Sequence, residues 1–259
     1  MQKLFILIVL VAMQSPTTGQ VLRKPIPDKT IVLTFDDAVK SDASYVPSLL
    51  KKYKFGGTFF ICEFPDFSDS SKYMNWKEIK QLYDSHFEIG NHTRSHKHLN
   101  KMTAPELIEQ VSYITNKCDS AGIVAPVSFA YPSSYAVKWA VNTLIAQGIL
   151  LARTNGERAY DPEKDHPLYI PSFGVSGSDN RKMFYDALSE AKDGKVVVFT
   201  FHGIPDYAHN WVSTPPALFE EYLQYLHKHN YHVISLNALL PYLDISKARQ
   251  LPIPPDTKK

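Results

Sequence analysis

An apolar stretch that ends in two adjacent carboxylates constrains this chain more than any other feature. Residues 30–35 read Thr-Ile-Val-Leu-Thr-Phe, and Asp36 and Asp37 follow directly. A run of β-branched and apolar residues predicts a buried strand of a parallel sheet, with neighbours covering both faces. In α/β folds the carboxyl ends of such strands are where ligands and catalytic groups collect. Taken alone, the two carboxylates favour a simpler reading, a turn in which they cap the next helix.

Strand-like and helix-like segments alternate along the rest of the chain. Apolar runs predict further strands at 58–62, 87–90, 127–131, 149–153, 195–201 and 233–234. Helical spacing of apolar residues predicts helices at 43–53, 76–85, 105–120, 136–147, 182–192, 216–230 and 237–243. Such alternation implies right-handed βαβ crossovers and a parallel sheet. About seven strand–helix units fit an α/β fold with a single distorted (β/α)7-type barrel better than a doubly wound sheet, and no glycine-rich phosphate loop follows any predicted strand.

Residues 1–19 have the pattern of a secretory signal peptide. Lys3 precedes an apolar run at 4–13, and small or polar residues follow at 15–19. An apolar core of about ten residues is too short for a membrane span, which needs about twenty. We therefore expect a secreted or periplasmic protein that keeps no stable membrane anchor after signal cleavage.

The remainder of the chain shows no internal repeat and no second domain. We expect a lead-in at 20–29, one domain at 30–245 and a C-terminal tail at 246–259. The tail carries several Pro and Lys residues after Gln250, where we expect it to be disordered. A formal net charge of +2 gives no reason to expect nucleic acid or an anionic membrane surface as a partner.

The chain contains two cysteines, Cys62 and Cys118. They would permit one disulfide in an oxidising compartment. Both lie among apolar residues and neither belongs to a CxxC pair, so we expect two separate buried thiols that hold no metal.

Two histidines four residues apart follow the third predicted strand. The sequence at 91–96 is Asn-His-Thr-Arg-Ser-His, and on a helical turn this spacing places the rings of His92 and His96 on one face. Two imidazoles and a carboxylate suit zinc, and a catalytic zinc site keeps three protein ligands and one open position. Asp37, at the end of another strand, is the natural third ligand. Ten histidines in the chain make a chance surface pair the alternative, and we expect His86 and His98 to be exposed.

His202 follows the near-continuous apolar run at 195–201. Its place at a strand end and a pKa near neutrality suit proton donation to a leaving group. A histidine at the edge of the core, hydrogen-bonded to backbone, is the alternative. Asp165, Asp179 and Asp206 are candidates for its acidic partner, and each is otherwise a surface carboxylate.

Four motifs, in this order, resemble the polysaccharide deacetylases, carbohydrate esterase family 4. The motifs are Thr34-Phe35-Asp36-Asp37, His92-Thr93-x-x-His96, Phe129-x-x-Pro132 and Phe201-His202-Gly203, and the resemblance covers roughly residues 30–244. The resemblance implies a distorted (β/α) barrel that removes acetyl groups, mostly from N-acetylated sugars, with one divalent metal ion, for which we expect zinc. Carried over by position, Asp37, His92 and His96 would ligate the metal. Asp36 would be the general base that deprotonates the attacking water, and His202 would protonate the departing amine.

The third motif departs from the commonest form of that family. Many members have Arg-Pro-Pro-Tyr-Gly after the phenylalanine, whereas this chain has Ala130, Tyr131, Pro132, Ser133 and Ser134. A branch of the family resembles this chain in having Phe-Ala-Tyr-Pro, so the change does not imply inactivity. We expect this loop to contact the oxyanion and the substrate, with a backbone N–H after the proline, that of Ser133, as the donor.

The arginine that the common motif supplies is thought to orient the base, and it is missing here. Arg153 lies at the end of the next predicted strand beside small residues. We interpret it as a candidate to supply the charge to Asp36 from a different position. An ion pair with Asp161 or Glu157 is an equally good reading.

These features predict a secreted, metal-dependent N-deacetylase whose partner is an acetylated glycan of the chitin-oligosaccharide or peptidoglycan type. An O-acetyl esterase on xylan-like glycans uses the same water attack and is one alternative. A non-catalytic carbohydrate-binding protein on the same scaffold is another, although the base, the ligand triad and the acid are all present. No oligomeric state is predicted. Aromatic residues near the catalytic face are candidates for stacking on sugar rings, namely Tyr131, Tyr135, Tyr207 and Trp211.

Overall fold

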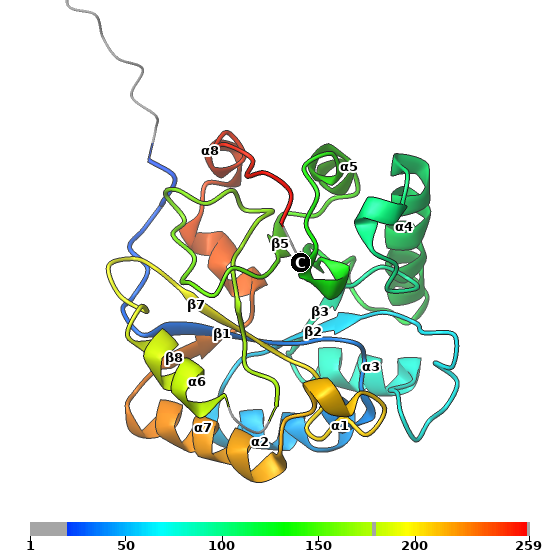
Figure 1. Ribbon diagram of the computed structural model, residues 1–259, viewed down its shortest axis with the longest axis horizontal. Coiled ribbons are helices and arrows are strands. Elements are labelled where there is room, and N and C mark those ends of the chain that lie inside the picture. Colours follow the sequence, from blue (N-terminus) through cyan, green and yellow to red (C-terminus); the bar gives the residue numbers. More distant parts are fainter. Residues whose placement is uncertain (1–19, 178–179, 258–259) are drawn as a thin grey trace, which may run out of the picture.

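A curled sheet of parallel strands forms the centre of the molecule (Figure 1). The computed structural model describes residues 20–177 and 180–257, so the predicted signal peptide at 1–19 lies outside the described residues. The strands are β1 (Thr30–Phe35), β2 (Thr58–Ile61), β3 (Glu88–Asn91), β4 (Ser128–Ala130), β5 (Leu151–Arg153), β6 (Phe173–Gly174), β7 (Val197–Phe201) and β8 (His232–Ile234). Their order is β5-β4-β3-β2-β1-β7-β6, with β8 paired to the first half of β1. All these pairings are parallel, as predicted.

The segment between β5 and β6 brings the two ends of this sheet together. Arg153 of β5 forms a parallel bridge with Ile170, whose N–H donates to the carbonyl of Ala152 at 2.9 Å. Three residues later, Phe173 of β6 is the register partner of Phe199 in β7. The sheet therefore curls into a distorted barrel, which confirms the predicted α/β fold of (β/α)7 type.

Helices surround the sheet on its outer side. They are α1 (Lys40–Ser44), α2 (Val46–Tyr53), α3 (Trp76–Asp84), α4 (Ala104–Ser120), α5 (Ala140–Ala146), α6 (Arg181–Leu188), α7 (Pro216–Lys228) and α8 (Ile245–Ala248). Short 3₁₀ helices are η1 (Leu99–Lys101), η2 (Pro132–Ser134), η3 (Asn210–Val212) and η4 (Asn237–Tyr242). In Figure 1, α1, α2, α3, α6 and α7 cover the lower side of the sheet, while α4, α5 and α8 stand around its upper side.

Local sequence signals fix where the two best-defined helices begin. The side chain of Asn75 accepts the N–H of Glu78 at 3.0 Å, and the Glu78 carboxylate accepts the N–H of Asn75 at 2.9 Å. Thr103 and Glu106 form the same capping box at the start of α4. Each box satisfies backbone N–H groups that a helix start otherwise leaves without partners.

Two predicted helices differ from the observed ones. The helix predicted at 43–53 is divided at Tyr45 into α1 and α2, and Pro47 lies in the first turn of α2. A proline there loses no intrahelical hydrogen bond, so the chain restarts a helix instead of continuing one. The helix predicted at 237–243 is the 3₁₀ helix η4, which contains Pro241.

The prediction of a disordered tail after Gln250 is wrong for the residues that the structure describes. Residues 251–257 return to the barrel, where Ile253 packs against the apolar cluster around α5. The N–H of Thr257 donates to the carbonyl of Ala136 at 3.0 Å. Proline content therefore reflects an extended backbone here and not a lack of contacts.

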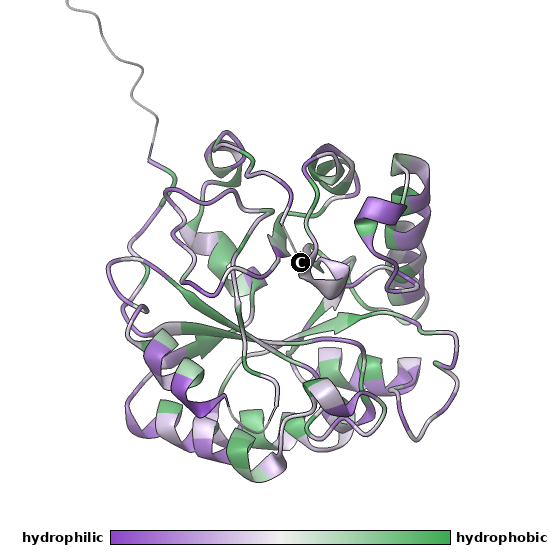
Figure 2. Cartoon of the chain, viewed as in Figure 1, coloured by the Kyte–Doolittle hydropathy of each residue, from purple (hydrophilic) through white to green (hydrophobic). Residues whose placement is uncertain are grey.

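Alternating residues of β1 face two different apolar clusters. Ile31, Leu33 and Phe35 pack beneath α2, α6 and α7, whereas Val32 faces a cluster to which β2, β4, β5 and β7 also contribute. The second cluster is the barrel interior, so both faces of β1 are buried, as its unbroken apolar run predicts. Figure 2 shows the same division, with hydrophobic strands inside and hydrophilic outer helix faces. Among the described residues, no helix is both long enough and apolar enough to cross a membrane.

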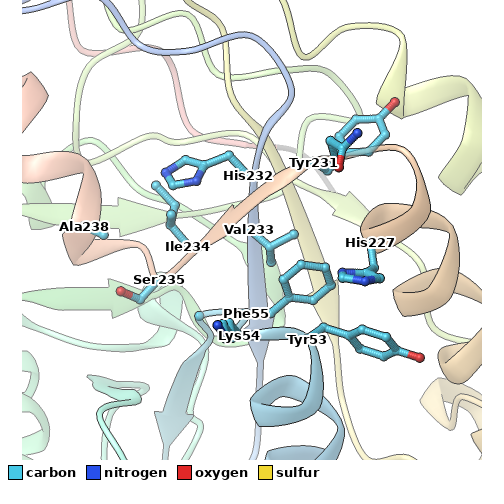
Figure 3. Close-up of a pocket in the computed structure, with 12 residues that line it drawn as sticks. Tyr53, Lys54, Phe55, His227, Tyr231, His232, Val233, Ile234, Ser235 and Ala238 are labelled. Carbon is cyan, nitrogen blue, oxygen red and sulfur yellow. The ribbon is translucent and has the colours of Figure 1, made fainter.

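A hollow of about 570 Å³ opens beside β8, at the amino-terminal half of β1 (Figure 3). The ring of His227 lies 4.9 Å from that of Tyr53, with Phe55 next to both, and His232 points away from them. β8 pairs with residues 30–32 of β1. This hollow therefore lies at the opposite end of the strand from the two carboxylates.

Gly90 of β3 provides a test of the barrel packing. A Cβ at this position would lie 2.4 Å from two ring carbons of Phe60, and Phe60 is fully buried in the barrel interior. We expect Gly90→Ala to lower the free energy of unfolding by about 1–3 kcal/mol, because an overpacked core forces shifts in the side chain and backbone. Urea denaturation measures this difference.

Gly174→Ala is the matched control, since a Cβ there meets no atom within 4 Å. We expect this control to change the unfolding free energy by less than about 0.5 kcal/mol. Equal losses in the two variants would contradict the packing described for Phe60.

Candidate metal centre and active site

The site residues lie just beyond the carboxyl ends of β1, β3, β4 and β7. Backbone hydrogen bonds carry the strand ladder one residue further at the ends of β1 and β3. The N–H of Asp36 donates to Phe201 at 3.0 Å, and that of His92 donates to Ile61 at 3.0 Å. Loops that are far apart in the sequence are therefore brought together at one end of the barrel, as parallel strands require.

Asp37, His92 and His96 form the only group of metal-ligating side chains found among the described residues. Their donor atoms all lie within 4.8 Å of one another. The Oδ1 atom of Asp37 is 3.5 Å from Nε2 of His92 and 3.6 Å from Nε2 of His96. Ligands of a tetrahedral zinc ion, bound at about 2.0–2.2 Å, are roughly 3.4 Å apart. The spacing therefore suits one divalent ion.

The backbone that presents the two histidines is a loop and not the helical turn predicted from their spacing. Residues 92–96 follow β3 without helical hydrogen bonds. Thr93 and His96 have φ values of 64° and 54°, in the left-handed region that non-glycine residues rarely adopt. With these two left-handed residues in the loop, the ring centroids of His92 and His96 lie 4.8 Å apart.

The hydrogen bonds of His92 select the tautomer that a metal requires. Its Nδ1 lies 2.8 Å from the carbonyl of Ala130, so Nδ1 carries the proton and Nε2 presents a lone pair. Nε2 is buried and has no hydrogen-bond partner among the described residues. A bound cation would satisfy this acceptor, and an outer hydrogen bond of this kind is typical of ligand histidines. Burial lowers the pKa of His92, and it lowers that of His96 to about 3, so both rings are neutral and able to bind metal.

Asp36 is buried beside the ligand group and is held by Arg153. The Nη2 atom of Arg153 lies 2.5 Å from Oδ2 of Asp36, and Nη1 donates to Thr200 at 2.7 Å. Arg153 is fully buried and does not pair with Asp161, whose carboxylate contacts Lys164. Of the two readings of Arg153, the structure therefore shows the contact with Asp36.

The register of the sheet explains how the arginine reaches this carboxylate. Ala130 of β4 and Arg153 of β5 are direct register partners. Ala130 occupies the position where the common form of the third motif has arginine. The guanidinium thus enters the site from the neighbouring strand, and the small side chain of Ala130 leaves room for it.

The two adjacent carboxylates have opposite pKa shifts. Burial alone would raise the pKa of Asp36, but Arg153, together with His92 and His202, outweighs burial and lowers it. Burial raises the pKa of Asp37 well above its usual value, and the charge of Asp36 adds to the increase. Such a separation marks a pair of carboxylates with different roles.

Cys62 extends the surroundings of Asp37. Its Sγ lies 3.7 Å from Oδ1 of Asp37, and burial raises the pKa of this thiol well above its usual value. Cys62 and Cys118 are both free and buried, as expected. The thiol therefore acts as a weak hydrogen-bond donor to the carboxylate.

His202 contacts a hydroxyl group where a carboxylate was expected. Its Nδ1 lies 3.1 Å from Oγ of Ser176, and burial lowers its pKa to about 4. Of the predicted acidic partners, Asp165 pairs with Arg158 and Asp206 pairs with His209, while residue 179 lies outside the described residues. Ser176 was missed because it belongs to a long irregular segment without a sequence motif.

The loop after β4 has strained backbone at the proposed oxyanion donor. Ser133 and Ser134 have φ values of 54° and 55°. The N–H of Ser133 makes no hydrogen bond to any described residue, and its Oγ lies 3.0 Å from Nε2 of His98. His98 is consequently half-buried, in contrast to the exposed position expected from the sequence, whereas His86 is exposed.

Tyr131 cannot stack on a sugar as the sequence suggested. Its ring is fully buried and packs against Phe129 and Tyr169 at centroid distances of 5.2 and 5.9 Å. Pro132 is buried as well. The aromatic residues of this segment therefore belong to the core, and the residues that line the cavity are Ser133 and Ser134, after Pro132.

Asp36 and two of the three metal-ligating residues, Asp37 and His96, open onto one cavity of about 570 Å³, whereas His92 is buried behind them. The residues that line it are Asp36, Asp37, Phe64, His96, Ser133, Ser134, His202, His209, Trp211 and Val212. His209 was not predicted as a site residue; its Nδ1 lies 3.2 Å from Oδ2 of the buried Asp206. Trp211 is largely exposed and lies 5.4 Å, centroid to centroid, from His209. The hollow beside β8 has the same volume, so only the donor groups, and not size, distinguish this cavity.

Comparisons with known proteins test the family and the fold. The family model described as polysaccharide deacetylase matches residues 23–149. This match confirms the resemblance to the polysaccharide deacetylase family that the motifs indicated. A comparison with curated protein sequences gave no match.

Solved structures of this family share the fold at low sequence identity. The Xyl-CE4 domain of a multidomain xylanase from the hindgut metagenome of Trinervitermes trinervoides is 18% identical, with a TM-score of 0.56 over 83% of this chain and 90% of that domain. PdaA of Bacillus subtilis, a family 4 carbohydrate esterase, is 20% identical, with a TM-score of 0.56 over 82% of this chain and 81% of PdaA. A family 4 pseudoenzyme from Bacillus anthracis is 17% identical, with a TM-score of 0.56 over 82% of this chain and 66% of that protein. At these identities the likeness establishes the fold.

The buried pair of Arg153 and Asp36 leads to a prediction about stability and pH. In Arg153→Met, burial would raise the pKa of Asp36 above its unfolded value, and the ionised carboxylate would lie unpaired in the barrel. A raised folded-state pKa destabilises the fold above the unfolded pKa, and the loss shrinks as the pH falls and the carboxyl takes up a proton. We expect a loss of about 3–5 kcal/mol at pH 7 and a clearly smaller loss at pH 5, measured by urea denaturation of chelator-treated protein.

The double variant Arg153→Met with Asp36→Asn is the control. It removes the unpaired charge, so it should recover most of the stability and show no such dependence on pH. A loss in Arg153→Met that stays constant between pH 5 and pH 7 would contradict the direct pairing.

Proposed function

We propose that this protein is a secreted, metal-dependent hydrolase that removes acetyl groups from N-acetylated amino sugars of the chitin-oligosaccharide or peptidoglycan type. One observation carries the proposal: the cavity holds a ligand group for one metal beside a second carboxylate that Arg153 keeps ionised. A binding protein needs no such division between two adjacent carboxylates. The match to the polysaccharide deacetylase family supports the same conclusion.

Asp37, His92 and His96 are the proposed ligands of the metal. Two imidazoles and one carboxylate suit zinc, and the orphaned Nε2 of His92 fits such an ion. When bound, a divalent cation would lower the pKa of a water molecule and polarise the acetyl carbonyl. Cys62 contributes a hydrogen bond to Asp37 and keeps its thiol protonated.

Asp36 is the proposed general base. Its lowered pKa keeps it ionised at neutral pH, and the short contact with Arg153 fixes one carboxylate oxygen. The other oxygen, Oδ1, is buried and has no hydrogen-bond partner among the described residues. This free oxygen is available to accept the proton of the attacking water, within the reach that general base catalysis requires.

His202 is the proposed proton donor to the departing nitrogen. Its pKa of about 4 means that the ring is neutral at neutral pH. Amide hydrolysis needs no net proton, because the proton that Asp36 takes from water equals the one that the amine gains. His202 would therefore relay this proton, with Ser176 fixing the ring through Nδ1.

The N–H of Ser133 is the proposed donor to the oxyanion. It is free of hydrogen bonds to other described residues, and the residue lines the cavity. A preorganised N–H of this kind stabilises charge that develops on the carbonyl oxygen. Trp211 and Phe64 flank the cavity and are proposed to contact the sugar ring.

An O-acetyl esterase is the second candidate, and one observation favours it. Among the described residues no carboxylate contacts Nδ1 of His202, and the carboxylate that lies 3.8 Å from its Nε2 is that of Asp37, a proposed metal ligand. An alkoxide leaves with less protonation than an amine does, so an ester makes a smaller demand on this residue. The Xyl-CE4 domain, from a protein named as a xylanase, has the same fold.

Acetate release from a panel of substrates tests the proposal. N-acetylglucosamine oligomers, peptidoglycan and acetylxylan would each be incubated with zinc-loaded and chelator-treated protein. We expect zinc-dependent release from the amino sugars. Release from acetylxylan alone would move the assignment to the esterase, and no release from zinc-loaded protein would leave the non-catalytic binding protein.

Asp36→Asn is the control for this panel. It removes the proposed base but leaves the three ligand side chains in place. We expect kcat to fall by about 10²–10⁴-fold while the dissociation constant for zinc, measured by calorimetry, stays within about twofold. Equal activity in the variant would contradict the role of Asp36.

A further inference from the structure

The last described residues of the chain lie against the loop that carries the proposed oxyanion donor. In Figure 1 the red C-terminal segment runs from α8 towards the green part of the chain beside β5. The two segments are in direct contact, because Thr257 bonds to Ser134, although these two residues are 123 positions apart in the sequence.

Four hydrogen bonds join residues 256–257 to the loop. The N–H of Thr257 donates to the carbonyl of Ala136 at 3.0 Å, and its Oγ1 accepts the N–H of Ala136 at 2.8 Å. The same Oγ1 donates to the carbonyl of Ser134 at 3.1 Å. Oδ1 of Asp256 accepts the N–H of Lys138 at 2.7 Å. Thr257 thus pairs with Ala136 in both directions, and the loop uses backbone groups throughout.

Apolar packing supports the same contact. Ile253 packs against the apolar cluster that contains Tyr131, Ala136 and Val137. These three residues are buried and flank the oxyanion loop on both sides. The tail therefore contacts the apolar cluster on which the loop rests through Ile253, and it contacts the backbone of the loop through Thr257.

The loop needs such support because its backbone is strained. Ser133 and Ser134 are consecutive non-glycine residues with positive φ, a conformation that costs free energy and persists only where the surroundings impose it. The carbonyl of Ser134 accepts two side-chain hydroxyls, from Thr154 at 2.7 Å and from Thr257 at 3.1 Å. One of these two hydroxyls belongs to Thr154, the residue after β5, and the other belongs to the tail.

We propose that the C-terminal segment Ile253–Thr257 is a positioning element for the oxyanion loop, with Thr257 as its principal residue. This segment fixes the positions of Ser134 and Ala136, which follow Ser133 in the chain. By doing so it keeps the N–H of Ser133 directed toward the cavity. Thr257 touches neither metal ligands nor substrate and acts through the loop. The role in catalysis rests on the proposed function, whereas the hold on the loop does not.

Amide exchange tests the hold on the loop without any activity. The N–H groups of Ala136 and Lys138 donate hydrogen bonds only to side chains of the tail. The rate of their hydrogen–deuterium exchange therefore reports whether the tail is docked on the loop. In Thr257→Val, which keeps the shape and removes the hydroxyl, we expect exchange in the 132–139 peptide to become about three- to tenfold faster. Thr257→Ser should restore the wild-type rate.

Two further variants define the range of the effect. A chain that ends at Leu251 lacks Ile253 and both hydrogen-bonding residues, so its 132–139 peptide should exchange faster still. Ser246→Ala is the matched control, because this exposed hydroxyl of α8 bonds only to Asp244. Its exchange in the 132–139 peptide should equal that of the wild type. Unchanged exchange in both Thr257→Val and the shortened chain would overturn the proposal.

Kinetics on the substrate found in the acetate-release panel then tests the catalytic consequence. A displaced oxyanion donor lowers kcat and leaves ground-state binding intact, so we expect kcat of Thr257→Val to fall about three- to tenfold with KM within twofold. Faster exchange with an unchanged kcat would overturn the positioning role. A wild-type protein that releases no acetate would contradict the proposed function alone, and the exchange rates would still decide whether the tail holds the loop.

Discussion

The buried ion pair between Arg153 and Asp36 is the interaction that gives the two adjacent carboxylates different roles. Two carboxylates at consecutive positions of a buried strand end repel each other, and burial raises the pKa of both. Arg153 reverses this for Asp36, and a bound cation would do the same for Asp37. Because the arginine enters from β5 through the register with Ala130, the loss of arginine from the third motif leaves the charge balance intact. The arginine is thus absent from its usual position in the motif, but Arg153 places a guanidinium beside Asp36 from the neighbouring strand.

Strained backbone concentrates where the chain changes direction around the cavity. Twelve non-glycine residues among those described have positive φ. Half of them lie in the loops after β1, β3 and β4, namely Asp37, Ala38, Thr93, His96, Ser133 and Ser134. Such conformations persist only when the surroundings over-determine them. The barrel supplies this through strand-end hydrogen bonds, and the C-terminal segment adds contacts behind the last of these loops.

The sequence predicted what depends on local pattern and on the convergence of parallel strand ends. The apolar run before Asp36 placed both carboxylates at one end of the sheet, and the structure brings His92, His96 and His202 to the same end. The sequence did not predict β6, because a two-residue strand leaves no periodicity to detect. Ser176 and His209 were missed because their contacts arise from irregular loops. The docking of Thr257 was missed for the same reason, since an extended tail shows no pattern until its partner is known.

An X-ray absorption spectrum of the zinc-loaded protein tests the central claim, that the two adjacent carboxylates are divided between metal and base. We expect two imidazole nitrogens and one carboxylate oxygen from the protein at about 2.0–2.2 Å, with no sulfur. The spectrum should be unchanged in Asp36→Asn and altered in Asp37→Asn. A change of coordination in Asp36→Asn, or a sulfur ligand at about 2.3 Å that implicates Cys62, would contradict the division.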